Sequence, residues 1–182
     1  MSSASNVIDF LHTVEQLKRT KRTGWLNNKI PNPESIADHM YRLGIMAMLL
    51  DDPQIDKTKC IKMALVHDLA ESLVGDIAPS DNVPKEVKYQ LEAQGMQKLA
   101  DTLGNTPAAK EIHALWIEYE NNETEESSFV HDLDKCEMIL QALEYEKSDD
   151  KKLDEFYECT RGIFKHPQVQ SWVEEIYKRR SH

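Results

Sequence analysis

The sequence predicts an all-α protein, a bundle of helices in one domain. Only six glycines and seven prolines occur in 182 residues, and most of them lie between segments. No stretch alternates apolar and polar residues as a half-buried strand does. Because 40% of the residues are hydrophobic, the chain can bury one sizeable core. We therefore expect a single domain over residues 1–182, with its core at about 7–178.

The N-terminal part is predicted to hold two amphipathic helices. Apolar residues at helical spacing mark the first helix, at Val7, Phe10, Leu11, Val14 and Leu17. A basic stretch follows, and two prolines then exclude a helix. Ser35, with Asp38 three residues later, is typical of a capping box that begins the next helix. This second helix carries His39 in its first turn and buries the apolar residues Ile36, Met40, Leu43 and Ala47.

The middle of the chain is predicted to contain a helix that ionisable residues interrupt. An apolar run begins at Met63, His67 and Asp68 break it, and apolar residues resume around Glu71. Gly75 ends this helix in the usual way, so the helix is expected over 63–74. The later helical patterns are separated by glycine, asparagine and proline breaks, and they cover residues 85–103, 107–121, 126–147, 151–163 and 168–179.

Composition excludes several classes of protein. A formal net charge of −10 argues against duplex nucleic acid as the main partner, because phosphate backbones are bound by cationic surfaces. No apolar run is long enough to span a bilayer, and the N-terminus has no signal-peptide pattern. The three cysteines, Cys60, Cys136 and Cys159, are odd in number and lack metal-ligand spacing. We expect reduced thiols in a cytosolic or nuclear protein without membrane contact.

Histidines and carboxylates within apolar segments indicate a metal site. An unpaired carboxylate in such a segment is costly, so a cation or a full set of donors should meet it. At helical spacing, His67, Asp68 and Glu71 can point into one space. His39 and Asp134 also interrupt apolar faces, and with His67 and Asp68 they make a site of nitrogen and oxygen donors. Such a site suits Mn²⁺, Co²⁺, Fe²⁺ or Mg²⁺ better than a closed structural Zn²⁺ site, and leaves positions for water and substrate.

Two further carboxylates, Glu71 and Asp76, have more than one interpretation. One helical turn and a short loop apart, they can chelate a second cation such as Mg²⁺. Alternatively, Glu71 can exchange a proton with a reacting group. The structural alternatives are a solvated helix face for Glu71 and ordinary turn chemistry for Asp76. His131, one turn before Asp134, can face either the same site or solvent.

Three stretches together carry a resemblance to a known family. They are residues 32–42 (NPESIADHMYR), residues 64–71 (ALVHDLAE) followed by 75–79 (GDIAP), and residues 133–138 (LDKCEM). Their histidines and aspartates follow the H…HD…D order of the HD-domain metal-dependent phosphohydrolases. In detail they resemble the eukaryotic HD-domain-containing 5′-deoxynucleotidases, relatives of the bacterial YfbR-type enzymes. The likeness runs from about residue 7 to 178, so the fold expected is a single HD-domain helical bundle.

The resemblance implies an activity and roles for particular residues. Members of that family remove phosphate from deoxyribonucleoside 5′-monophosphates with divalent cations, on an all-helical and usually dimeric fold. The implied ligands of the first metal are His39, His67, Asp68 and Asp134. Glu71, Asp76 and the backbone carbonyl of Ile77 match positions associated with a second cation. In the bacterial relatives, the matching glutamate and aspartate are catalytic or contact the sugar instead, and both interpretations stay open here.

Arg22 and Trp25 are the candidate substrate-binding residues. An arginine can bind phosphate oxygens in a forked geometry, and an indole can pack against a sugar and exclude a 2′-hydroxyl group by shape. Trp25 matches the family's tryptophan, but the bacterial enzymes place arginine directly before it, where this chain has Gly24. Arg19 and Lys21 are therefore alternatives to Arg22. The basic stretch can also be a solvated surface or a nuclear-targeting run.

The function predicted from sequence is a metal-dependent 5′-deoxynucleotidase that forms a homodimer. Mn²⁺, Co²⁺ or Mg²⁺ is the expected ion, with Fe²⁺ and Zn²⁺ as alternatives. One alternative function is another nucleotide phosphohydrolase of the superfamily, acting on cyclic nucleotides, dNTPs or a guanosine polyphosphate. The other is a non-enzymatic nucleotide-binding module with a structural metal. Trp116, Tyr119 and Trp172 are candidates for the dimer surface, although core packing explains them equally well.

Overall fold

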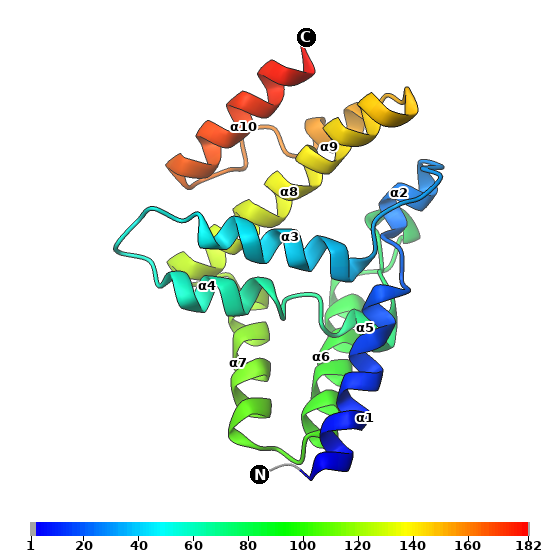
Figure 1. The fold of residues 1–182 in the computed structure, drawn as a ribbon, viewed down its shortest axis with the longest axis vertical. Coiled ribbons are helices and arrows are strands. Elements are labelled where there is room, and N and C mark those ends of the chain that lie inside the picture. The colour runs from blue at the N-terminus through cyan, green and yellow to red at the C-terminus, as the bar shows by residue number, and fades with distance from the viewer. Residues whose placement is uncertain (1–2, 182) are drawn as a thin grey trace. The chain divides into compact units, whose positions relative to one another are not determined.

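The computed structural model describes residues 3–181 and consists of helices and their connections (Figure 1). Within these residues there is no strand, and the one β-bridge joins Lys21 to Ser35. The helices in chain order are α1 (Ala4–Val14), η1 (Glu15–Lys18), α2 (Thr23–Asn27), α3 (Ile36–Met48), α4 (Lys57–Ala64), α5 (Glu71–Val74), η2 (Pro79–Asp81), α6 (Lys85–Thr102), α7 (Pro107–Asn121), α8 (Glu125–Asp149), α9 (Asp154–Glu158) and α10 (Pro167–Arg180). The predicted all-α class is confirmed. No helix of the described part is both long and apolar enough to cross a membrane.

The chain divides into two compact units that alternate along the sequence. The first unit consists of the chain up to Met40 together with Leu65–Ile117, and the second consists of Tyr41–Ala64 together with the chain from Glu118 onward. That the whole chain forms one domain stays a prediction.

The first unit is built on α1, α5 and α6, which pack against one another, and η1 packs against α1 and α5. Its buried cluster joins residues far apart in sequence: Leu17, Ile36, Met40, Leu69, Ala70, Met96, Leu99 and Trp116. Gly95 of α6 lies against the residue before α5, where a Cβ would be in van der Waals contact with the Ala70 carbonyl oxygen, at 3.4 Å. This packing fixes the start of α5, which carries Glu71.

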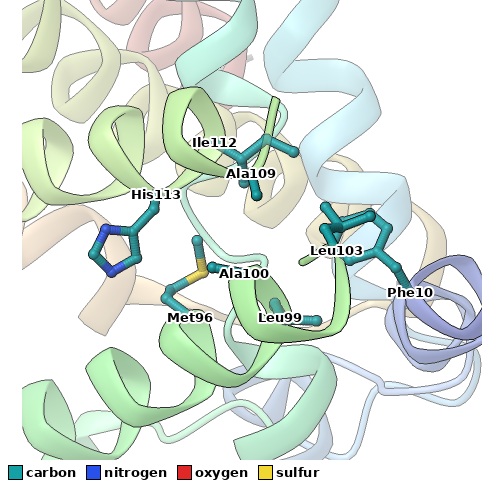
Figure 2. A pocket seen from close by; sticks show the side chains of 8 residues that line it. All are labelled: Phe10, Met96, Leu99, Ala100, Leu103, Ala109, Ile112 and His113. Atoms are coloured by element: carbon teal, nitrogen blue, oxygen red, sulfur yellow. The ribbon is translucent and has the colours of Figure 1, made fainter. Parts of the chain in front are cut away.

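A small apolar hollow lies between α1, α6 and α7 of the first unit (Figure 2). Carbon-rich side chains form nearly all of its wall: Phe10, Met96, Leu99, Ala100, Leu103, Ala109, Ile112 and His113. The free space is too narrow for a water molecule, so the hollow is a packing gap in the core. A hollow of this size and lining does not suit a polar ligand.

The second unit is organised around α8, which packs against α4, α9 and α10. Asp132 on α8 is buried, and one of its oxygens, Oδ2, accepts hydrogen bonds from the backbone N–H groups of Lys165 and His166, each at 2.7 Å. Those two residues directly precede Pro167, the first residue of α10. The carboxylate therefore satisfies backbone donors at the start of α10 and supplies negative charge there.

Replacing Asp132 with alanine is expected to destabilise the protein by about 2 kcal/mol, because two backbone donors lose a charged acceptor. The melting temperature should fall by about 4–8 °C, measured by circular dichroism. Glu174→Ala, an exposed acidic residue on α10, is the matched control and should change the melting temperature little. An Asp132→Ala protein as stable as this control would contradict the capping role.

Two helix predictions need correction, and one short helix was not predicted. The expected helix over 63–74 is broken, because α4 ends at Ala64, residues 65–70 form successive turns, and α5 begins only at Glu71. Most side chains between 63 and 72 are buried, so tertiary packing rather than helical period sets this backbone. Of the expected helix over 151–163, only Asp154–Glu158 forms, and Gly162 lies in a left-handed turn at φ 75°. Helix α2 has five residues, too short for a periodic pattern.

Two predicted helix ends are confirmed. At the start of α3, the backbone N–H of Ser35 donates to Asp38 Oδ2 at 2.7 Å, and the backbone N–H of Asp38 donates to Ser35 Oγ at 3.1 Å. This reciprocal pair is the expected capping box. Gly75 follows α5 at φ 77°, a conformation that favours glycine, and turns the chain toward Asp76.

Candidate metal centre

Two histidines and an aspartate of the first unit meet around one point. The Nε2 atoms of His39 and His67 lie 3.3 Å apart. Asp68 Oδ2 lies 3.2 Å from Nε2 of His67 and 3.7 Å from Nε2 of His39. Both imidazoles are buried. The predicted convergence of these three side chains is therefore present within one unit, a His/Asp cluster that could bind a metal.

These distances fit ligands of one metal ion. Two atoms about 2.1 Å from an ion lie about 3.0 Å apart at a right angle and about 3.4 Å apart at the tetrahedral angle. Two neutral imidazole nitrogens that face each other can share only one proton, whereas an ion between them satisfies both. The set of two nitrogens and one carboxylate oxygen suits a borderline divalent cation.

The backbone around the cluster explains how its side chains converge. His39 lies in the first turn of α3, held by the Ser35–Asp38 capping box. His67 and Asp68 lie in the turns between α4 and α5, where the N–H of Glu71 donates to the carbonyl of Asp68 at 3.0 Å. These tight turns let the adjacent side chains of His67 and Asp68 both point toward His39. In a regular helix, the side chains of two adjacent residues would point about 100° apart.

Asp68 is held as a carboxylate. Burial disfavours its charged form, but the charges of His67, His39 and Arg22 outweigh burial and hold the pKa of Asp68 well below its ordinary value. The Nη1 atom of Arg22 lies 3.5 Å from Asp68 Oδ2. A metal ligand of this kind must be deprotonated, and this environment keeps it so.

Arg22 lies beside the cluster, and Trp25 supports it from the interior. The Nε atom of Arg22 lies 3.5 Å from Glu34 Oε1, and the indole Nε1 of Trp25 donates to the same oxygen at 2.8 Å. Trp25 is only 1% exposed, so its ring is part of the core. Arg19, an alternative to Arg22, is exposed and pairs with Glu15 at 2.7 Å. Sequence reasoning did not single out Glu34, although it directly follows Pro33 in the stretch that carries the resemblance.

Glu71 is buried next to the cluster, with 4% of its surface exposed, so the solvated helix face considered for it is wrong. Its Oε2 atom is buried and has no hydrogen-bond partner. Burial, and then the negative charges of Asp68 and Asp76, raise the pKa of Glu71 well above its ordinary value, although Lys88 and Arg22 oppose this. An orphaned carboxylate oxygen in a buried site is costly to the fold and is typical of a functional group.

Replacing Glu71 with glutamine is expected to stabilise the metal-free protein. A carboxyl group whose pKa is raised by folding takes up protons more readily when folded, so its contribution to stability falls as pH rises above its unfolded pKa. At about pH 8 the Glu71→Gln protein should melt about 2–4 °C higher than the parent, and the difference should shrink toward about pH 4. The exposed Glu86→Gln on α6 is the control. A lower melting temperature for Glu71→Gln at about pH 8 would contradict this account.

Asp76 and Ile77 follow Gly75, and both already have protein partners. Oδ2 of Asp76 accepts the backbone N–H of Thr23 at 2.5 Å, and its carbonyl accepts the Thr23 hydroxyl at 2.7 Å. The carbonyl of Ile77 accepts a hydrogen bond from Lys88 Nζ at 3.2 Å. Neither Thr23 nor Lys88 was singled out from sequence, because no pattern indicated which residues approach this loop.

Asp134 lies on α8 in the second unit and is buried. Its Oδ2 atom is 2.9 Å from Lys135 Nζ and 3.5 Å from the Tyr119 hydroxyl. Near it, His131 stacks on the Tyr119 ring, with the centroids 3.9 Å apart, and its Nε2 lies 2.9 Å from the Tyr119 carbonyl oxygen. A place for Asp134 in the metal site stays a prediction.

An all-helical fold with a buried His/His-Asp centre defines a class of protein. Residues 14–176 match the family model described as HD domain, and the chain belongs to that family. The predicted family is thereby confirmed.

Named relatives extend over nearly the whole chain. 5′-Deoxynucleotidase HDDC2 of Xenopus laevis is 47% identical over 182 residues, which cover 99% of this chain and 90% of the relative. The human protein of the same name is 46% identical, with 98% and 88% covered. 5′-Deoxynucleotidase hdd1 of Schizosaccharomyces pombe is 44% identical, with 96% and 90% covered.

Solved structures share the fold. The PH0347 protein from Pyrococcus horikoshii OT3 superposes with a TM-score of 0.77 at 33% identity, covering 96% of this chain and 98% of that chain. A predicted metal-dependent phosphohydrolase from Magnetospirillum magnetotacticum MS-1 gives a TM-score of 0.70, with 96% and 95% covered. At 24% identity, this second likeness shows the fold alone.

Proposed function

We propose that this protein is a metal-dependent 5′-deoxynucleotidase, which hydrolyses deoxyribonucleoside 5′-monophosphates to deoxynucleosides and phosphate. The observation that carries the proposal is the meeting of His39, His67 and Asp68 donor atoms within 3.7 Å of one another. Relatives that are 44–47% identical over nearly the full chain bear this name, which supports the substrate class. Absence of a nucleophilic serine or cysteine motif favours direct attack by water.

The proposed ligands of the ion are His39, His67, Asp68 and, from α8, Asp134. Mn²⁺, Co²⁺ and Mg²⁺ are favoured by the nitrogen and oxygen donors, with Fe²⁺ and Zn²⁺ as alternatives. When bound, a divalent ion supplies a water nucleophile at neutral pH and positive charge opposite the phosphate.

The protein's own residues orient the substrate and move the proton. Arg22 is half-buried between Asp68 and Glu34, and its guanidinium donates to phosphate oxygens. Trp25 is buried against Glu34, so we assign it a positioning role, through Glu34 and Arg22, in place of direct contact with the sugar. Glu71, with its raised pKa and free Oε2, takes a proton from the attacking water or gives one to the leaving 5′-oxygen. Asp76, fixed by Thr23, keeps negative charge beside Glu71 and so maintains that raised pKa.

We further propose that the protein forms a homodimer through α3. Three large apolar side chains recur on the exposed face of this helix, namely Tyr41, Ile45 and Met48, and the exposed Leu49 directly follows its last residue. Trp116 and Tyr119, two of the aromatic residues considered from sequence, are buried instead. Sedimentation equilibrium of Ile45→Glu should then show monomers where the parent shows dimers.

A cytosolic or nuclear location is proposed from the cysteines. Cys60, Cys136 and Cys159 are all free thiols, and the first two are buried. Burial raises the pKa of each buried thiol to about 12, so both are unreactive structural residues. Such thiols are typical of reducing compartments.

Phosphate release from a panel of substrates tests the proposed function. The purified protein should release phosphate from dAMP and other deoxyribonucleoside monophosphates, faster than from ribonucleotides, and chelation of metal should abolish the activity. Faster turnover of dNTPs, cyclic nucleotides or guanosine polyphosphates would favour another hydrolase of the superfamily. Metal-dependent melting and nucleotide binding without turnover would favour the non-enzymatic module.

A further inference from the structure

Lys88 lies one turn into α6, and its side chain reaches the loop that follows α5. Its ammonium nitrogen, Nζ, donates to the carbonyl oxygen of Ile77 at 3.2 Å and lies 3.5 Å from Glu92 Oε1. The contact between α5 and α6 holds the two segments at this separation. The ammonium group is therefore built into the acidic side of the proposed active site.

The negative charges of four carboxylates act on this ammonium group and keep it charged. Burial lowers the pKa of Lys88, but the negative charges of Glu92, Glu71, Asp68 and Asp76 outweigh it and raise the pKa above its ordinary value. Lys88 acts on Glu71 in turn, because its positive charge is among those that oppose the raised pKa of Glu71. Lys88, together with Arg22, is thus a cation that balances these carboxylates.

The positions expected to hold a second divalent ion are the ones that Lys88 approaches. Of the three expected ligands, the Ile77 carbonyl accepts the Lys88 ammonium, and Asp76 Oδ2 accepts the Thr23 N–H. A divalent ion on the Ile77 carbonyl would lie within a few ångströms of the positive charge on Lys88, which repels it. The residues present therefore do not fit an open site for a second divalent ion.

We propose that the ε-ammonium group of Lys88 takes the place of a second divalent cation, so that the protein binds one divalent ion per chain. This inference rests on the proposed function only for the first ion, at His39, His67 and Asp68. The Lys88 side chain is 38% exposed, so solvent reaches part of it. With Arg22, it supplies fixed positive charge that a dissociable ion would otherwise provide.

Metal stoichiometry, measured by equilibrium dialysis against Mn²⁺ and elemental analysis, tests this inference. The parent protein should bind about one Mn²⁺ per chain, because Lys88 excludes a second ion. Lys88→Met removes the charge but keeps a similar length, and it should bind about two, because Glu71, Asp76 and the Ile77 carbonyl become available. Lys88→Arg, which keeps the charge, should bind about one, as should Lys85→Met, the matched change at an exposed lysine of the same helix.

Circular dichroism of each variant verifies folding, and Lys88→Gln replaces Lys88→Met if that variant does not fold. Two Mn²⁺ ions per chain in the parent would overturn the inference while leaving the proposed function intact. One bound ion in both the parent and Lys88→Met would also overturn the inference, because the ammonium group of Lys88 would then not be occupying a site for a divalent ion. If the parent protein bound no Mn²⁺ at all, the result would contradict the proposed function, and the inference with it.

Discussion

His67→Ala is expected to lose the divalent ion and to release phosphate from dAMP about a thousandfold more slowly than the parent, or slower still. His67 Nε2 lies within 3.3 Å of donor atoms from both His39 and Asp68, so its removal takes away the ligand that both neighbours share. The remaining imidazole and carboxylate can pair with each other, at 3.7 Å, and no longer need an ion. Elemental analysis of the purified variant and a phosphate-release assay are the two measurements.

Two companion variants make this result specific. Asp68→Asn keeps the shape of the side chain but removes its charge, and it should lose the ion and the activity together. His12→Ala removes an exposed histidine on α1 and should retain both. If metal-free His67→Ala hydrolysed dAMP at the parent rate, the assignment of this cluster as the catalytic centre would be wrong.

Arg42→Met is expected to destabilise the protein by about 3 kcal/mol or more, because it removes the guanidinium group that pairs with a buried carboxylate. The Glu137 side chain has no exposed surface, and its Oε1 accepts from Nε and Nη2 of Arg42 at 2.7 and 2.6 Å. Arg42 also donates to Gln141 and Glu144, both on α8. Although burial opposes its charge, Glu137 and Glu144 raise the pKa of Arg42 further above its ordinary value. Urea unfolding measures the loss.

The comparison with two other variants distinguishes a buried pair from a surface one. Glu144 is half exposed, so Glu144→Gln should cost about 0–1 kcal/mol. Arg42→Met combined with Glu137→Gln should recover part of the stability lost in Arg42→Met, since the buried charge that Arg42 balanced is gone as well. An Arg42→Met protein within about 1 kcal/mol of the parent would show that Glu137 finds another partner.

Local patterns predicted the parts of the fold that local interactions determine. The capping box at Ser35 and Asp38 forms between residues three apart, so its sequence pattern is sufficient. The stop at Gly75 depends on a backbone conformation that glycine adopts without strain. The long helices α6, α7 and α8 begin and end within a few residues of the predicted ranges, because many turns of consistent pattern average out local exceptions.

The candidate site was predicted in part for a different reason. His67, Asp68 and Glu71 are ionisable residues within apolar surroundings, and only a compensating partner makes such a sequence stable. That rule identified the residues but assumed a helix, whereas the backbone there is a series of turns. The same rule does not identify Glu34 and Lys88, because it would require knowing which residues they approach in the folded protein.

By itself, the sequence determined that the protein is helical, where its long helices begin and end, and which histidines and aspartates must find a cation. Only the tertiary structure decided that Trp25 is buried behind Arg22, that Glu71 has an orphaned oxygen, and that Lys88 meets the Ile77 carbonyl. The physical reason is the separation along the chain of the residues that interact. Helix ends and apolar periodicity depend on neighbours three or four residues away, whereas burial and the partner of each charge depend on segments that the chain brings together from afar.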